Sequence, residues 1–424
     1  MNVPFHAAPT ARSQPTTESR IYHAVGIGWL VYWLTNSYVW MADVVPILNF
    51  YVVTTTFLLY FTVARAQQVI QFVLRPGIWL WAITALIPVL LYLTASNASG
   101  YAYLGARDRI LFFALVAGSG LVMADRDGPW MLRRAAGIAL AIAVVVNFGE
   151  FFVHNPYNRT EGTRSAGFYG DPNICGAAIG TLLLLYQPVT KQSRRSLLIT
   201  GIAFMAIVAT MSRSGMVFAV GLVGVYLFLP RGPGTLPMSS RILIGAGALG
   251  MLILGSVVML SVVDLSAHET WRIRSLLTLD LSDESTTGRL DMASFAYRRF
   301  EEYFWTGRGP GSTQEYAVYA HNTYLTIGYD YGIFGILLYL AFIGFGFVKY
   351  FKYGWARSAT YVLMAFQVVY YSNFAHDVHT NAVFAVMFAS FLTNASLEPA
   401  AMRAAPSRSV PVGLTPHGQS ARTA

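Results

Sequence analysis

The sequence predicts an all-helical protein that crosses a membrane many times. Its residues are 55% hydrophobic and only 12% charged, whereas ordinary soluble domains carry about 25% charged residues. The mean hydropathy is +0.49. A helix of roughly 20 apolar residues crosses a bilayer, and about twelve such runs can be counted along the chain. They lie near residues 22–38, 41–64, 77–95, 102–124, 135–153, 170–188, 195–211, 214–230, 242–263, 322–348, 359–375 and 380–397.

The distribution of basic residues predicts the orientation of these spans. The formal net charge is +9, and most of the 29 Lys and Arg residues fall in segments on the same side as the N-terminus. Cytoplasmic segments of membrane proteins are enriched in Lys and Arg. We therefore expect both termini in the cytoplasm, and we attribute the positive charge to a membrane rather than to nucleic acid.

The spans divide the chain into five parts. Residues 1–21 form a polar cytoplasmic tail without the pattern of a cleavable signal, and residues 22–263 hold transmembrane helices 1–9. Residues 264–321 form a long outer loop, and a loop of this length is usually functional. Residues 322–397 hold helices 10–12. Residues 398–424, rich in Ala, Pro, Ser and Arg, predict a disordered cytoplasmic tail.

The long outer loop contains a predicted amphipathic helix. Thr286 or Thr287 is placed to cap a helix that begins near Gly288. Apolar side chains then recur at helical spacing, with charged residues on the other face. We expect this helix to lie over the membrane surface. Its apolar positions are Met292, Phe295, Ala296, Phe300, Tyr303 and Phe304.

The end of this loop carries two further signals. Residues 307–312 read Gly-Arg-Gly-Pro-Gly-Ser and lack the Lys-Ser/Thr of a phosphate-binding loop, so we expect a backbone reversal there. His321 and Asn322 then open the next span. A histidine at this position is either a structural hydrogen-bonding group or a base that takes a proton at neutral pH.

Two arginines lie where a cation is unfavourable without a partner. Arg213 falls in the short turn of residues 211–215 between two spans, and an arginine at a helix centre costs about 2.5–3.5 kcal/mol. It therefore either snorkels outward or faces a polar cavity. Arg289 falls in the first turn of the predicted loop helix, where the helix dipole disfavours a cation. A bound anion or solvation would offset that cost.

Other polar groups allow two interpretations. Asp43 and the Arg107-Asp108-Arg109 cluster are expected at the headgroup level, with a cavity as the alternative. In the outer loop that contains Arg159, Glu161 and Arg164, either Asp171 or Asn173 caps the next helix.

The remaining candidates for special chemistry are a histidine-rich loop and one cysteine. His376, Asp377 and His379 resemble a metal-ligand cluster, but short polar loops often contain such residues, and we expect no metal. Cys175 lies in an apolar span and is expected to serve packing, since one cysteine permits no intramolecular disulfide.

The order of these motifs resembles a known family. The motifs are Arg164 to Gly167, Asp171-Pro172-Asn173, Ser212-Arg213-Ser214-Gly215, Thr287-Gly288-Arg289, Gly307-Arg308-Gly309, and His321-Asn322 before Gly332. Together they resemble the O-antigen ligases of lipopolysaccharide, within the wider group of O-antigen ligases and polymerases.

The resemblance implies a GT-C-like membrane glycosyltransferase in a Gram-negative inner membrane, with its long loop and active site in the periplasm. Such enzymes move a finished glycan from undecaprenyl diphosphate to the lipid A-core, without nucleotide sugar, metal or other cofactor. Its partners would be the undecaprenyl diphosphate-linked O-antigen, the lipid A-core and membrane lipids. Arg213 and Arg289 would bind the diphosphate, and His321 would act on the acceptor hydroxyl in an inverting transfer. The further substrate contacts would be Arg164, Arg159, Asn173, Asn322, Arg308 and Tyr324.

Two alternatives remain. An O-antigen polymerase would use the same kind of donor but extend a second lipid-linked chain. A lipid or sugar transporter would also have about twelve spans with intramembrane charges, although transporters often show internal repeats, and none is visible here.

Overall fold

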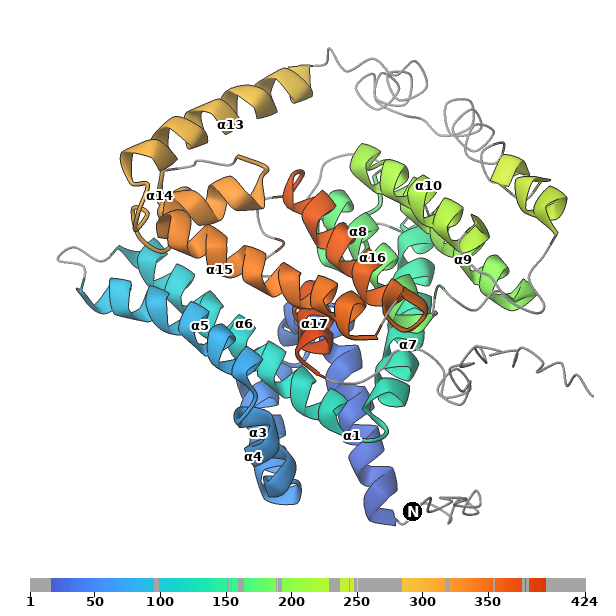
Figure 1. Ribbon diagram of the computed structural model, residues 1–424, viewed down its shortest axis with the longest axis horizontal. Helices are drawn as coiled ribbons and strands as arrows, with labels where there is room; N and C mark the ends of the chain where they lie inside the picture. The colour runs from blue at the N-terminus through green and yellow to red at the C-terminus, as the bar shows by residue number, and fades with distance from the viewer. Residues whose placement is uncertain are drawn as a thin grey trace, which may run out of the picture.

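The computed structural model describes residues 17–94, 99–150, 152–153, 155–158, 164–187, 189, 193–228, 237–243, 245–247, 250, 284–316, 320–353, 355–375, 378 and 381–393. Every regular element in these residues is helical, which confirms the predicted all-helical class (Figure 1). Most of the predicted span 242–263, the first part of the long loop and the predicted tail 398–424 lie outside the described residues.

Most of the described helices correspond to predicted spans. Their bounds are α1 (Thr17–Leu34), α2 (Ser37–Val44), η1 (Pro46–Leu48), α3 (Phe50–Ala64), α4 (Ala66–Val73), α5 (Pro76–Thr94), α6 (Gly100–Ala124), α7 (Gly128–Gly149), η2 (Gly167–Tyr169), α8 (Pro172–Tyr186), α9 (Arg194–Ala209), α10 (Arg213–Phe228), α13 (Glu284–Glu302), α14 (Ser312–Glu315), α15 (Thr323–Tyr353), α16 (Trp355–Ser372) and α17 (Ala382–Leu392).

Local sequence signals explain where several of these helices begin. Asp171 caps α8, since its carboxylate accepts hydrogen bonds from the amides of Asn173 at 2.7 Å and Ile174 at 3.1 Å. Of the two residues predicted as caps, Asp171 is therefore the one used. Pro46 opens η1 and separates α2 from α3, because proline cannot donate the backbone hydrogen bond that would continue α2. The predicted span 41–64 is thus divided.

Few of the described helices meet a strict test for crossing a membrane. By length and composition, residues Gly128–Gly149 in α7 and Thr323–Val348 in α15 pass, and the α4–α5 pair passes as one span bent by 77°. Shorter apolar helices are α3, α8, α10 and α17. The membrane-protein class is thereby supported, and the count of about twelve spans stays a prediction.

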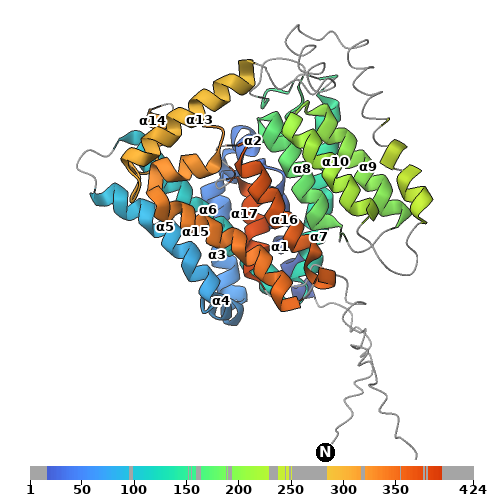
Figure 2. The same cartoon turned by 45° about the horizontal axis from the view of Figure 1, so that its top comes forward.

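The centre of the molecule is α17. Every residue from Ala382 to Phe391 is buried, and a helix that is apolar on all sides belongs in an interior. It packs against α6, α15, α8 and α1, which surround it in Figures 1 and 2. The short length of α17 is consistent with a helix enclosed by protein on its flanks.

A kink divides α15 into two parts. Gly332 has φ 67° and ψ −165°, outside helical geometry, and a Cβ there would lie 2.3 Å from the carbonyl oxygen of Trp305. Only glycine fits this backbone and this contact. Figure 1 shows the two parts of α15 running in different directions from the kink. The predicted span 322–348 is therefore a short helix over residues 323–331 followed by a long one.

The amphipathic helix of the long loop is α13, and it lies along the first part of α15. Ala296 and Phe300 are buried, and Ala296 packs with Ala320 and Tyr329. A Cβ on Gly328 would lie 3.0 Å from the Phe300 ring, so glycine permits the close approach of the two helices. The helix starts at Glu284, earlier than predicted, and the proposed caps Thr286 and Thr287 lie inside it. Asp and Glu near a helix N-terminus are favoured by the helix dipole.

Candidate functional site

The start of α8 is bonded to the turn between α9 and α10. The Ser212 hydroxyl donates a hydrogen bond to Asn173 Oδ1 at 2.8 Å, and it accepts one from the Gly215 amide at 3.1 Å. Ser212 therefore caps α10 while Asn173 fixes Ser212. Arg213, the next residue, is half-buried, and its backbone position is set by these two bonds.

Arg164 lies against the same turn. Its Nε donates to the Thr210 carbonyl at 3.4 Å, and the amide of Ser165 donates to the Ala209 carbonyl at 3.4 Å. Arg164 and Arg213 are thus carried by backbone segments that lie side by side. Arg159, the other arginine predicted in this loop, lies outside the described residues.

Helix α16 and the residues directly after it connect the start of α10 to the start of α15. The Tyr370 hydroxyl donates to the Ser214 carbonyl at 2.9 Å, and the Thr323 hydroxyl donates to the Ala375 carbonyl at 2.6 Å. Ser214 follows Arg213, and Thr323 lies two residues after His321. The structure therefore places Arg213 and His321 at the same end of the helix bundle, which we call the site end.

Strained backbone is concentrated at the site end. Among the described residues, the non-glycine positions with positive φ are Asn36 at 57°, Met211 at 48° and His321 at 45°. Met211 and His321 belong to the two segments just described. The Asn36 amide donates to the Phe168 carbonyl of η2 at 2.8 Å, directly before α8. Such conformations cost of order 1–3 kcal/mol each and cluster at functional sites.

Asn322 and Tyr324 hold the start of α15 in place. Asn322 Oδ1 accepts a hydrogen bond from the Leu325 amide at 3.1 Å and so caps the helix. The Tyr324 hydroxyl donates to the Val369 carbonyl of α16 at 3.5 Å, and its ring lies 5.9 Å from that of Tyr339. Both side chains position the segment that presents His321.

Arg289 lies on a different element, α13. It is half-buried and sits in the second turn of α13, not in the first turn as predicted, because the helix begins at Glu284. The C-terminal part of α13 packs on α15. In Figures 1 and 2 its N-terminal part, which carries Arg289, extends from there toward the side of α8 and α16.

The glycine-rich segment of residues 307–313 is a structural turn, as predicted. The buried Asp330 carboxylate accepts hydrogen bonds from the Gly311 amide at 3.3 Å, the Thr313 amide at 2.9 Å and the Thr313 hydroxyl at 3.3 Å. The Gly309 amide donates to the Asp330 carbonyl at 3.0 Å. These amide groups bind the protein itself, so they do not form a phosphate cradle.

Arg308 lies among tyrosines beside this turn. Its guanidinium carbon is 3.7 Å from the Tyr316 ring centroid, and its Nη1 donates to the Tyr329 hydroxyl at 3.3 Å. Burial lowers the pKa of Arg308, but the hydrogen bond to Tyr329 and the surrounding phenols raise that pKa to a net value above the ordinary one. Arg308 is therefore a permanent cation stacked on aromatic rings.

The sequence did not predict the structural roles that Glu150 and Tyr370 have at the site end. Glu150, after the last residue of α7, accepts hydrogen bonds from the Asn158 side chain at 3.1 Å and the Ala166 amide at 2.9 Å, and also from Asn155. It thereby organises the loop that carries Arg164. In the sequence, Glu150 was marked only by its position as a single carboxylate at the end of a predicted span. Tyr370 had no signal, because it lies in an ordinary apolar stretch.

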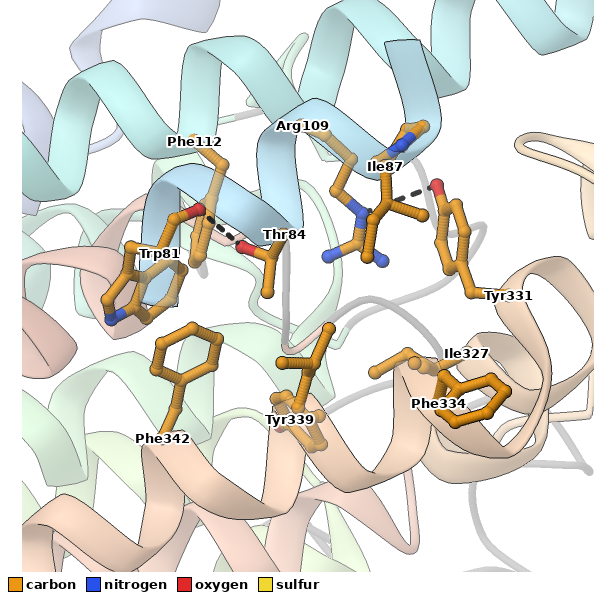
Figure 3. Close-up of a pocket in the computed structure, with 13 residues that line it drawn as sticks. Trp81, Thr84, Ile87, Arg109, Phe112, Ile327, Tyr331, Phe334, Tyr339 and Phe342 are labelled. Carbon is orange, nitrogen blue, oxygen red and sulfur yellow. Dashed lines mark hydrogen bonds between the residues drawn. The ribbon is translucent and has the colours of Figure 1, made fainter. Parts of the chain in front are cut away.

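A pocket with a cavity volume of about 60 Å³ lies away from this cluster, between α5, α6 and α15 (Figure 3). Its lining is aromatic and aliphatic except for Arg109 and Thr84. Arg107 pairs with Asp108 at 2.7 Å, and both side chains are about one third exposed. The Arg107-Asp108-Arg109 cluster was expected at the headgroup level, with a cavity as the alternative. Arg109 follows the alternative, because it lines a cavity.

The described residues contain no group of three His, Cys, Asp or Glu side chains placed to hold a metal ion. His376, Asp377 and His379 lie outside them. Cys175 is buried and its Sγ accepts a hydrogen bond from the Asn147 amide at 3.3 Å, as expected for a residue that serves packing.

No curated protein matches the chain. A family model described as O-antigen ligase matches residues 198–340, which run from α9 to beyond the kink of α15. The matched segment contains Arg213, Arg289 and His321, whereas Arg164 and Asn173 precede it. The resemblance drawn from the motifs is confirmed over residues 198–340, which match the O-antigen ligase model.

Proposed function

We propose that this protein is a membrane glycosyltransferase that ligates O-antigen to lipid A-core. It takes a glycan from undecaprenyl diphosphate at the periplasmic face of a Gram-negative inner membrane, within a GT-C-like fold of about twelve spans. The observation that carries the proposal is that the family match covers Arg213 and His321, and that α16 and the residues directly after it bond the two segments bearing them to one end of the bundle.

In this proposal the arginines stabilise the leaving group. As the bond between the anomeric carbon and the diphosphate breaks, negative charge grows on the departing phosphate oxygens. Arg213 and Arg289 each present a planar fork that binds two such oxygens. Preorganised cations of this kind stabilise developing charge without a metal ion or other cofactor. Arg164, bonded to the turn beside Arg213, supplies a third cation.

His321 is assigned as the general base. The acceptor hydroxyl of the lipid A-core loses its proton to the imidazole as its oxygen attacks the anomeric carbon. Attack from the face opposite the diphosphate forms the new glycosidic bond with inversion. A positioned base contributes typically 10²–10⁴-fold to such a rate. The backbone of His321 has a positive φ of 45°, and the next residue, Asn322, caps α15.

The other predicted contacts receive supporting roles. Asn173 and Asn322 are positioning residues, because their side chains bond Ser212 and the first turn of α15. Tyr324 holds α15 against α16. Arg308 and Arg159 are assigned to the glycan part of the donor.

The test is transfer by purified protein in detergent with chelator present, given an undecaprenyl diphosphate-linked glycan with and without lipid A-core. The informative variant is His321→Asn, because asparagine tolerates positive φ and so preserves the backbone. We expect transfer to fall by roughly 10²–10⁴-fold. The matched control is His23→Asn, since His23 lies on α1 and bonds Asp127 at 3.1 Å, remote from the site end.

Each other outcome has a definite meaning. Full transfer by His321→Asn removes the base assignment. Longer lipid-linked chains formed without lipid A-core identify a polymerase. Absence of any covalent product, even after divalent metal replaces the chelator, contradicts a transferase and favours transport.

A further inference from the structure

The pocket between α5, α6 and α15 continues into a second hollow. The pocket itself has a cavity volume of about 60 Å³, and the adjoining hollow one of about 440 Å³. Ile87, Tyr331, Phe334 and Leu338 line both. Ile87 belongs to α5 and the other three to α15, so the combined space passes between these two helices. Almost all of its lining is apolar, which suits a hydrocarbon chain.

One cation faces this apolar space. Arg109 Nε donates to the Tyr331 hydroxyl at 3.4 Å, and its guanidinium carbon lies 4.9 Å from the Tyr331 ring centroid. Figure 3 shows the guanidinium pointing into the pocket between Ile87 and Tyr331. In the described part of the chain, no carboxylate lies within 4.0 Å of Arg109, although the buried Asp330 carboxylate interacts with it over a longer distance. The charge of neighbouring Arg107 is already matched by Asp108.

The depth of Arg109 makes this charge significant. It follows the first residue of α6, Gly100, by roughly 13 Å along the helix axis at 1.5 Å per residue. Arg109 lies in the predicted span 102–124, and an ionisable residue within a membrane helix is costly and usually marks a binding or transport function. An anion bound at Arg109 would offset that cost, and the apolar lining requires that the anion carry a hydrocarbon chain.

We propose that this pocket binds a membrane phospholipid. Its phosphodiester pairs with Arg109, one acyl chain lies along the pocket and the adjoining hollow, and the rest of the lipid leaves between α5 and α15. The single guanidinium complements the single negative charge of a phosphodiester. A lipid diphosphate carries more charge and would need a second cation.

The lipid would also act on the kink of α15. Tyr331, which contacts Arg109, directly precedes Gly332, and the adjacent Asp330 anchors the glycine-rich turn. Filling the pocket therefore fixes the junction between the two parts of α15. Binding of this lipid does not depend on the proposed ligase activity and is measured without it.

The test uses delipidated, detergent-purified full-length protein with phosphatidylglycerol or with diacylglycerol of the same chains. We expect phosphatidylglycerol to raise the melting temperature by on the order of 5 °C and to be retained in native mass spectrometry, and diacylglycerol to do neither. Arg109→Gln and Leu338→Trp should each weaken lipid binding at least about tenfold, the first by removing the charge and the second by filling the pocket.

Matched controls separate binding from folding. Arg107→Gln removes the neighbouring, already paired arginine, and Leu340→Trp adds the same bulk at a position 44% exposed on the same helix. Both should keep the response of the wild-type protein, and all four variants should melt within a few degrees of it without lipid. Equal responses to diacylglycerol, an unchanged response in Arg109→Gln, or tighter Arg109-dependent binding of undecaprenyl diphosphate would each overturn the proposal.

Discussion

At the scale of single residues, the site end separates side chains that hold the backbone from side chains that carry charge. Some polar side chains form hydrogen bonds at the starts of helices, namely those of Ser212, Asn173 and Asn322. Arg213 directly follows Ser212, and His321 directly precedes Asn322. The geometry therefore fixes where each charged side chain starts, and the chemistry depends on the type of side chain placed there.

For glycan transfer, the two parallel hydrogen bonds that each guanidinium can donate should matter more than its positive charge. Arg213→Lys and Arg289→Lys keep the cation but lose one of two parallel hydrogen bonds, and a hydrogen bond to a charged group contributes roughly 1.5–3 kcal/mol. We therefore expect about 10- to 100-fold lower transfer from each substitution in the ligation assay described above.

The control for this pair is Arg298→Lys, because Arg298 is exposed on the same helix as Arg289. It should transfer glycan at the rate of the wild-type protein. Near-normal turnover of Arg213→Lys and Arg289→Lys would mean that these residues attract the donor only through their charge.

At the scale of elements, the kink of α15 and the glycine-rich turn form one unit. The amides of Arg308 and Gly309 donate to the carbonyls of Tyr329 and Asp330 at 2.7 and 3.0 Å, and the Ile333 amide donates to the Phe304 carbonyl at 2.7 Å. The end of α13 and the kink are therefore bonded on both sides of Gly332. The orientation of the first part of α15, which begins beside His321, depends on this unit.

Substitution of Gly332 by alanine should destabilise the protein strongly. The new Cβ would lie 2.3 Å from the Trp305 carbonyl oxygen and 2.6 Å from the Gly307 amide nitrogen, and positive φ alone costs of order 1–3 kcal/mol. We expect the melting temperature in detergent to fall by at least about 5 °C.

Gly344→Ala is the matched control in the same helix. A Cβ there meets nothing within 4 Å, and alanine is favoured over glycine in a helix by roughly 1 kcal/mol. Its melting temperature should be equal to or above that of the wild-type protein. Equal stability of the two variants would contradict the requirement for glycine at the kink.

At the scale of the whole molecule, the predicted orientation assigns the site end to the outside of the membrane. Helix α13 lies at that end, and the turn between α6 and α7 lies at the other end of α6. Cys175 is buried, so the natural protein should react little with a thiol reagent. Cysteines introduced at exposed positions can therefore report the two sides.

Arg298→Cys on α13 and Arg126→Cys between α6 and α7 are both exposed positions. In cells with a permeabilised outer membrane, a membrane-impermeant maleimide should label Arg298→Cys within minutes and label Arg126→Cys only after the inner membrane is disrupted. The unmodified protein measures the background from Cys175. The reverse labelling pattern would invert the topology and place the candidate site in the cytoplasm.

Several features were determined by the sequence alone. Apolar composition predicted an all-helical membrane protein, because each span satisfies its backbone hydrogen bonds within itself. A cap at Asp171 or Asn173, the reversal at residues 307–312 and the amphipathic character of α13 follow from side-chain chemistry over a few neighbouring positions. The family resemblance likewise followed from short motifs in a fixed order, including Arg213, Arg289 and His321.

Only the tertiary structure decided how these motifs meet. The hydrogen bonds from Tyr370 to Ser214 and from Thr323 to Ala375 join segments far apart in the chain, and helical periodicity carries no information about such pairs. The strained φ of His321 and the break at Gly332 depend on neighbours from other elements. Arg109 was expected at the membrane surface, but the packing of α5 and α15 around it created a pocket. Side chains close together in the sequence determine the secondary structure of each segment, whereas packing between distant segments determines which polar groups lie in the same site.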